Sequence, residues 1–241
     1  MPSEEFERAV SYPYRILEHS YVIQNGEYKE LAGEIEPAAL SDRVPILAVG
    51  SNQSPEQLAR KFSGPQWSAI PVIRAQLADF DTVYSPHITS YGSIPSTLQW
   101  APGAAVTLFV TWLDREQLKR MHETEIGTAN YGYGSLTGIK IEPELGPPLE
   151  SVFVYASRRG AMHHSGSPIS VAEIPATGRK WPARTQMQVQ AHVRDRLAPE
   201  IDLDEFIRDA IDGPEVRRAR TEMLERDSQP FNPPDFVIIE I

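Results

Sequence analysis

The sequence contains no cysteine among its 241 residues. This absence excludes disulfide bonds, thiolate ligands for zinc and cysteine nucleophiles. Long apolar runs are missing too, because no stretch approaches the roughly 20 residues that a helix needs to cross a bilayer. The polar segment 1–7 also lacks the charged and apolar pattern of a secretory signal. We therefore expect an unexported, cytoplasmic protein that has no membrane partner.

Basic runs are scarce as well. Lysine and arginine number 23 against 33 aspartates and glutamates, which gives a formal net charge of -10. A nucleic-acid partner requires a broad basic surface that contacts phosphates, so the sequence predicts no such partner. Small basic patches remain, such as Arg217, Arg218 and Arg220, and we expect these arginines to form the solvent-exposed face of a helix.

What is present is an ordinary globular composition, with 41% hydrophobic and 23% charged residues. Three regions follow each other along the chain. Residues 1–43 form a polar N-terminal extension with a possible hairpin at 21–26. Residues 44–160 form a strand-rich core, and residues 161–241 form a mostly helical C-terminal extension packed on it. Strands are predicted at 44–49, 72–84, 96–100, 105–113, 136–142 and 151–156.

The C-terminal extension shows helical spacing. Val189, Val193 and Leu197 recur every fourth residue, which predicts one helix. A capping box at 202–205 precedes a second helix, and the pair Gly213-Pro214 ends it and starts a third. The weak alternation at 236–241 predicts a final strand.

The turn at 50–53 lies between a predicted buried strand and a predicted helix. Ser54 suits the N-cap of that helix, and Gln57 stands where a capping box places its glutamine. Gly50 allows a close approach of the backbone, and the helix N-terminus next to it carries partial positive charge. We predict a pocket for a small polar ligand here. The same residues also suit a strand-to-helix turn without any ligand.

A second helix is predicted to begin after Asp114, with Gln117 at the capping-box position. Glu125 follows Met121 by four residues and therefore extends the inward face of this helix. A carboxylate in that position meets an unfavourable helix dipole and loses water, a conflict that functional sites often contain and that suits a general base. The alternative is that the helix ends by His122 and leaves Glu125 in a solvated loop.

Taken together and in order, these pieces resemble the γ-glutamyl cyclotransferase-like family over about residues 44–155. The resemblance implies an α+β fold built on a small mixed β-barrel with packed helices. It also implies that Glu125 is the catalytic base and that no cofactor or metal takes part. The matching segments are Gly50-Ser51-Asn52, Gly92 to Leu98, Pro102-Gly103, Leu113-Asp114, Glu125 and Tyr131. The substrate-binding residues expected on this basis are Gly50, Ser51, Asn52, Gln53 and Tyr131.

The reaction that the resemblance implies is an internal cyclisation. Removal of a proton from the α-ammonium of a γ-glutamyl group frees an amine that attacks the γ-carbonyl, which closes 5-oxoproline and expels an amine or peptide. The sequence departs from the family at three positions: Val49 replaces Tyr, His122 replaces Asp and Ile126 replaces Gly. A second hypothesis is therefore a non-catalytic module that binds a small carboxylate-bearing ligand or a partner, and a homo-oligomer is left open.

Two further alternatives remain at this point. His122 and Glu125 have a spacing compatible with metal binding, with His87 or the pair His163-His164 as further ligands. Ser51 as a hydrolase nucleophile is weaker, because the sequence around it lacks the Gly-x-Ser-x-Gly pattern. The segment 128–134, with alternating Gly and Tyr, either covers a pocket or forms a turn into the next strand.

Overall fold

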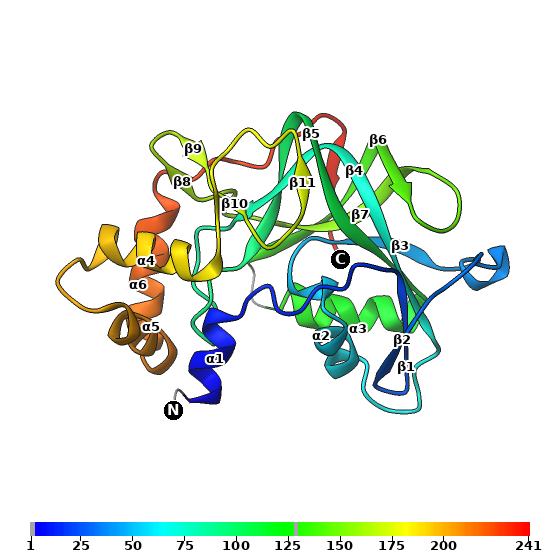
Figure 1. Ribbon diagram of the computed structural model, residues 1–241, viewed down its shortest axis with the longest axis horizontal. Coiled ribbons are helices and arrows are strands. Elements are labelled where there is room, and N and C mark those ends of the chain that lie inside the picture. The colour runs from blue at the N-terminus through cyan, green and yellow to red at the C-terminus, as the bar shows by residue number, and fades with distance from the viewer. Residues whose placement is uncertain (1–2, 128–129) are drawn as a thin grey trace.

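The computed structural model describes residues 3–127 and 130–241, and its centre is a closed barrel of five strands (Figure 1). The strands follow the order β5-β3-β7-β6-β4, and β4 pairs back with β5 to close the barrel. The β3–β7 pair is parallel and the other pairs are antiparallel, so the barrel is mixed, as the sequence predicted. The barrel strands are β3 (Val44–Ala48), β4 (Ile70–Tyr84), β5 (Ser96–Leu113), β6 (Tyr131–Pro143) and β7 (Leu149–Ser157).

Strand β5 joins two segments that the sequence predicted as separate strands. The polar turn signal at Pro102-Gly103 does not end the strand, because β4 bends with it: the register shifts between Ala78 and Phe80. At this bulge the Gly103 N–H donates a hydrogen bond to the Asp79 carboxylate at 2.7 Å. A bulge of this kind lets long paired strands curve around a small barrel.

Two helices cover one side of the barrel, α2 (Pro55–Lys61) and α3 (Arg115–Glu125). The side chains of Leu58 and Met121 are fully buried between these helices and the strands. The predicted capping box of Asp114 and Gln117 is present at the start of α3. Because α3 continues to Glu125, the alternative in which it ends by His122 is wrong.

The capping box predicted for α2 does not form. Ser54 occupies the N-cap position, but its hydroxyl donates to the Glu56 carboxylate at 2.9 Å instead of accepting a backbone N–H. The Gln57 side chain therefore does not cap the start of α2, and it lines a cleft instead.

The N-terminal region adds to the barrel sheet. The predicted hairpin is confirmed: β1 (Tyr21–Gln24) and β2 (Glu27–Glu30) are joined by Asn25 and Gly26, which have φ values of 54° and 76°. Strand β1 pairs with β4, so the hairpin continues the sheet outward. The helix α1 (Glu4–Val10) precedes it, and two short 3-10 helices follow, η1 (Pro37–Ala39) and η2 (Ser51–Gln53).

The C-terminal region contains the three predicted helices, but they begin only at Gln186, after a segment of short strands. Helices α4, α5 and α6 pack together at one end of the barrel, next to α1 (Figure 1). The final strand returns to pair with β6. The elements are α4 (Gln186–Leu197), α5 (Leu203–Asp212), α6 (Pro214–Glu225) and β13 (Phe236–Ile238). Short strands precede them: β8 (His163–His164), β9 (Ser167–Pro168), β10 (Ser170–Val171), β11 (Ala176–Thr177) and β12 (Ala183–Arg184).

The expectation that the arginine cluster on α6 forms a solvent-exposed face holds only for Arg218. Arg218 is exposed, but Arg220 is only 8% exposed. Its guanidinium donates to the Phe206 carbonyl at 2.7 Å and lies over the Phe206 ring. Arg220 therefore holds α6 against α5. The side chain of Arg217, which is half-buried, lines the cleft.

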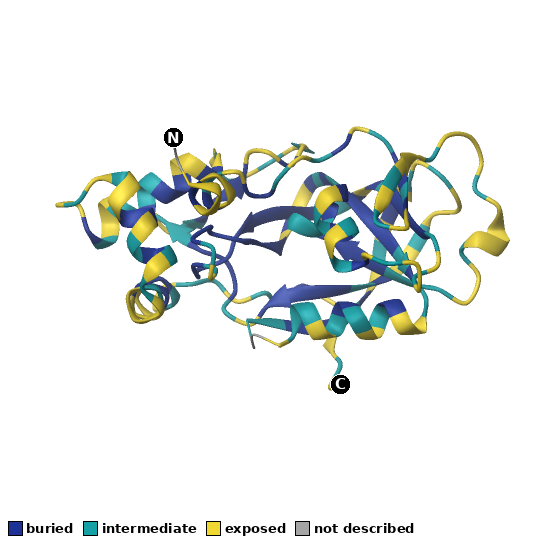
Figure 2. Ribbon diagram, turned by 90° about the horizontal axis from the view of Figure 1, so that it is seen from below, coloured by how far each residue is buried: buried dark blue, intermediate teal, exposed yellow. Residues whose placement is uncertain are grey.

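Burial follows this architecture. Figure 2 shows mostly buried barrel strands and helices whose outer faces are exposed. One core cluster runs from the barrel interior to the C-terminal helices, where Val110 and Phe206 both belong to it. A second lies between the barrel and helices α2 and α3. Over the ranges 3–127 and 130–241, no helix is long and apolar enough to cross a membrane.

Candidate active site

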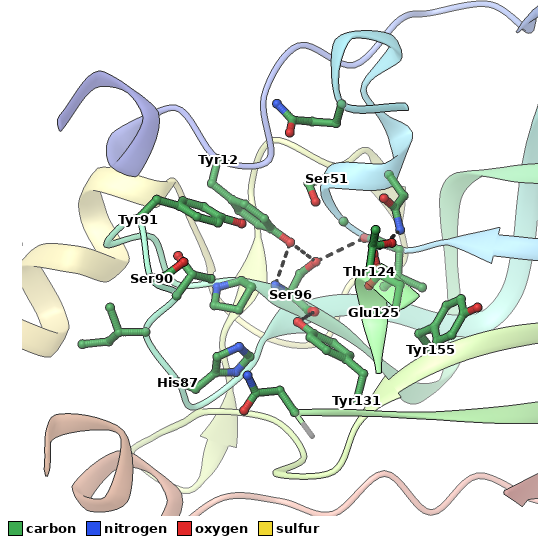
Figure 3. Close-up of a pocket in the computed structure, with 18 of the residues that line it drawn as sticks. Tyr12, Ser51, His87, Ser90, Tyr91, Ser96, Thr124, Glu125, Tyr131 and Tyr155 are labelled. Carbon is green, nitrogen blue, oxygen red and sulfur yellow. Dashed lines mark hydrogen bonds between the residues drawn. The ribbon is translucent and has the colours of Figure 1, made fainter. Parts of the chain in front are cut away.

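A cleft of about 480 Å³ opens where the turn after β3, the end of α3 and the start of β6 meet (Figure 3). This volume lies in the usual range for pockets that hold small organic ligands. Five of the six residues predicted for the site line it. They are Gly50, Ser51, Asn52, Glu125 and Tyr131. Residues 128 and 129 of the segment that leads to Tyr131 lie outside the described residues.

The turn after β3 forms the 3-10 helix η2. Within the described part of the chain, neither the Ser51 nor the Asn52 N–H donates a backbone hydrogen bond. Gly50 fits closely against its neighbours, since a Cβ atom there would lie 2.2 Å from the Tyr12 hydroxyl oxygen and 2.5 Å from Ser96 Oγ. The turn therefore offers unused N–H donors beside a backbone position that tolerates no side chain.

The Glu125 carboxylate lies next to this turn. Asn52 Nδ2 donates to Glu125 Oε1 at 3.1 Å, and Lys61 Nζ forms an ion pair with the same oxygen. Lys61 also donates to Asn52 Oδ1 at 2.6 Å, so the three side chains form a closed polar triangle. Among the described residues no group donates a hydrogen bond to Glu125 Oε2. One carboxylate oxygen is thus fixed, and the other is available to a ligand.

Lys61 was missed by the sequence interpretation. It lies in the last turn of α2, where a basic residue is common because it interacts favourably with the helix dipole. Only the packing of α2 against α3 brings it to Glu125. The carboxylate is therefore not the isolated, inward-facing group that the sequence suggested.

Gln53 is the one predicted site residue that does not line the cleft. Its side chain is fully buried, and Nε2 donates to the Val49 carbonyl at 3.2 Å. Its own carbonyl accepts a hydrogen bond from the Tyr21 hydroxyl at 2.9 Å. Gln53 supports the turn from behind, and its side chain does not reach the cleft in this structure.

Two tyrosines complete the wall around Ser96. The Tyr12 hydroxyl lies 2.8 Å from Ser96 Oγ and accepts the Ser96 N–H at 2.8 Å (Figure 3). Tyr131 donates to the Ser96 carbonyl at 3.1 Å. Burial raises the pKa of Tyr12 to about 12 and that of Tyr131 well above its ordinary value, so both remain neutral phenols. Sequence analysis missed Tyr12, because it stands in a segment without periodicity, far from the turn.

The histidines near the cleft are engaged in packing and hydrogen bonding. Burial, with the charge of Arg159 nearby, lowers the pKa of His87 to about 3, and its Nδ1 lies 3.0 Å from the Ser85 hydroxyl. His122 Nδ1 lies 2.8 Å from the Tyr155 hydroxyl. Burial also lowers the pKa of His122. Both imidazoles are therefore neutral near pH 7.

The metal alternative finds no support in this arrangement. In the part of the chain that the structure describes, no three histidine, aspartate or glutamate side chains are placed to hold a metal ion. Glu125 contacts Lys61, while His163 Nε2 lies 3.1 Å from the Gln229 side chain. Ser51 gains no support as a nucleophile either, since no described histidine hydrogen-bonds to it.

Comparison with known proteins adds likeness at the level of fold. No protein-family model matches the sequence, and no curated protein matches it. Among similar solved structures, one entitled "Gamma-glutamyl cyclotransferase" is 16% identical and has a TM-score of 0.39, over 69% of this chain and 86% of that one. The uncharacterized protein loc79017 from Homo sapiens is 15% identical, with a TM-score of 0.40 over 70% and 88%.

A third similar structure, YkqA from Bacillus subtilis, is 12% identical and has a TM-score of 0.37, over 73% of this chain and 56% of that one. The first of these three structures bears the name of the family that the sequence resembles. At such low identities and TM-scores the likeness does not extend to individual site residues.

Proposed function

We propose that the cleft binds a small γ-glutamyl compound and converts it to 5-oxoproline and a free amine, with Glu125 as the general base. One observation carries the proposal. Glu125 presents an oxygen that accepts no hydrogen bond from a described group, in the same cleft as a turn whose Ser51 and Asn52 N–H groups donate none within the described residues.

Substrate binding follows from these two features. The N–H groups of the turn suit the α-carboxylate of a γ-glutamyl group, because consecutive backbone donors form a favourable site for an anion. The α-ammonium then lies toward Glu125, where a charge-assisted hydrogen bond to Oε2 orients it. Close approach of the substrate at Gly50 requires the missing side chain.

The chemistry is an intramolecular acyl transfer. Glu125 removes one proton from the α-ammonium, and the nitrogen lone pair then forms a bond to the γ-carbonyl carbon. The bond between that carbon and the leaving nitrogen breaks, and the leaving nitrogen takes up two protons, the one that Glu125 accepted and one that the ring nitrogen releases, so that it departs as an ammonium. The products are 5-oxoproline and an amine, and Glu125 returns to its carboxylate form. Holding both ends of the substrate supplies much of the rate, because attack within one molecule needs the correct orientation.

The position of Lys61 favours a second candidate function, a module that binds a small carboxylate-bearing ligand without converting it. Its ammonium occupies one side of the Glu125 carboxylate, which narrows the space for a substrate ammonium. In the catalytic proposal Lys61 keeps Glu125 and Asn52 in place and leaves Oε2 to the substrate. In the binding module it neutralises the carboxylate permanently.

The decisive experiment replaces Glu125 by glutamine and follows 5-oxoproline formation from γ-glutamyl dipeptides and γ-glutamyl amines. We expect kcat to fall about 10²- to 10⁴-fold, the usual contribution of a general base. Glu123→Gln is the matched control, because Glu123 lies on the same helix but is exposed and paired with Arg120. Equal rates for Glu125→Gln and wild type would exclude Glu125 as the base.

A binding measurement separates the two candidates. If calorimetry detects binding of the γ-glutamyl compounds to the wild-type protein but no product forms, the non-catalytic module is favoured. If neither binding nor product is found, both candidates fail.

A further inference from the structure

The cleft is lined by two arginines that the proposed reaction does not use, and one of them lies over Tyr91, across the cleft from Glu125 (Figure 3). Arg8 comes from α1 and Arg217 from α6, and both line the same cleft as the turn at Gly50. They belong to the N-terminal and C-terminal regions, on either side of the barrel in sequence. The fold brings these regions together at Tyr91-Gly92, as the packing there shows.

Gly92 is the point where the helices meet. A Cβ atom at Gly92 would lie 2.7 Å from Ile211 Cγ1 and 3.2 Å from Ala9 Cβ, so the residues next to Arg8 and the end of α5 touch the same position. The Arg8 guanidinium lies 4.2 Å from the centre of the Tyr91 ring. Arg217 Nη1 donates to the carbonyl of Ala210 at 2.6 Å. Both guanidinium groups are therefore held in place beside one end of the cleft.

The charges of these two arginines are not neutralised. Within residues 3–127 and 130–241, neither Arg8 nor Arg217 forms an ion pair, whereas the neighbouring Arg218 pairs with Glu215. The stacking on Tyr91 and the contact with a carbonyl orient the guanidinium groups but carry no opposite charge. Two oriented, uncompensated cations in the cleft of a protein with a net charge of -10 suit an anionic ligand group.

We infer that Arg8 and Arg217 form a subsite for a carboxylate on the departing part of the substrate. The inference rests on the proposed function, because it assumes that the γ-glutamyl end lies between the turn and Glu125. The γ-glutamyl group then directs its leaving amine toward the other end of the cleft, and a volume of about 480 Å³ leaves room for it. The preferred substrates are accordingly γ-glutamyl amino acids or peptides, and simple γ-glutamyl amines are poor ones.

The test compares two probes, γ-glutamylglycine and γ-glutamylethylamine, which differ in the carboxylate of the leaving group. Their preference ratio is taken from kcat/KM where product forms and from dissociation constants by calorimetry where it does not. For the wild-type protein we expect γ-glutamylglycine to be favoured about tenfold, the value of one charge-assisted contact. In Arg8→Gln and Arg217→Gln the ratio should fall toward one.

Arg218→Gln is the matched control, because it removes an exposed arginine that directly follows Arg217 on α6, and its ratio should stay at the wild-type value. Arg8 is exposed, so Arg8→Gln remains informative even if Arg217→Gln weakens the contact between α5 and α6. An unchanged ratio in both cleft variants, with product still formed, would overturn the subsite and leave the reaction standing. A lowered ratio by calorimetry without any product would support the subsite and overturn the reaction. Absence of binding and product with both probes would overturn both.

Discussion

Gly50 shows how tightly single residues determine the shape of the cleft. Its identity as a turn residue could be predicted from the apolar strand before it and the helix after it. Its contact with Tyr12 could not, because nothing in the sequence relates the polar segment around residue 12 to the end of β3. The same holds for Lys61, whose position beside Glu125 depends on the angle between two helices. Local patterns thus identified the turn and the position of Glu125 on α3, and long-range packing supplied their partners.

Replacement of Gly50 by alanine tests this close contact. The added methyl group would overlap the Tyr12 hydroxyl, so we expect the free energy of unfolding to fall by about 1–3 kcal/mol, as for other overpacked sites. Tyr12→Phe removes the hydroxyl oxygen at the cost of two buried hydrogen bonds with Ser96, about 1 kcal/mol each. The double variant should lose less unfolding free energy than the sum of the losses in the two single variants. Strict additivity in urea unfolding would show that the contact does not cause the loss.

At the scale of elements, the residues that mark where an element begins or ends predicted helix α3 better than strand β5. The capping box of Asp114 and Gln117 marked the start of α3 correctly, and the spacing of Met121 and Glu125 indicated how far the helix continues. The strand β5 was divided in two because Pro102-Gly103 is normally a turn signal. In the barrel this pair lies opposite a bulge, and bulges arise from pairing between strands, which a single segment cannot reveal.

The cap of α3 gives a prediction at this scale. In Asp114→Ala the N–H of Gln117 loses its side-chain acceptor, and the helix that carries Glu125 is weakened at its start. We expect the free energy of unfolding to fall by about 1 kcal/mol, the typical value of an N-cap. Asp114→Asn keeps an acceptor oxygen and should retain most of the stability. The comparison is made by chemical denaturation, and equal losses in the two variants would contradict a capping role.

At the scale of the whole molecule, the three regions expected from the sequence are joined closely. Strand β13 returns to β6, and the Ile88 N–H donates to the Thr221 hydroxyl at 3.2 Å, which links the connection after β4 to α6. His87 lies at this junction and is 3% exposed. The order of the regions could be predicted, but contacts between residues more than a hundred positions apart could not, since they leave no periodic trace.

Acid should loosen this junction. The pKa of His87 is lowered from 6.5 to about 3. As the pH falls below 6.5, the unfolded chain therefore binds a proton at this histidine while the folded chain does not. The stability contributed by the neutral imidazole is complete above pH 6.5 and is lost progressively as the pH falls toward 3. By about pH 5 the loss amounts to about 2 kcal/mol.

The measurement is urea unfolding of wild type and His87→Gln at about pH 7.5 and about pH 5. The difference between the two pH values should be smaller in His87→Gln by about 2 kcal/mol. Equal pH dependence in wild type and His87→Gln would show that His87 is not responsible.

The cleft is bounded by Arg8 near one end of the sequence and by Arg217 near the other. During synthesis on the ribosome, the barrel strands therefore emerge long before the last wall of the cleft does. A nascent chain that has formed the barrel still lacks α6, and with it one side of the cavity. The complete site therefore forms only after α6 has been synthesised, well after the last strand of the barrel.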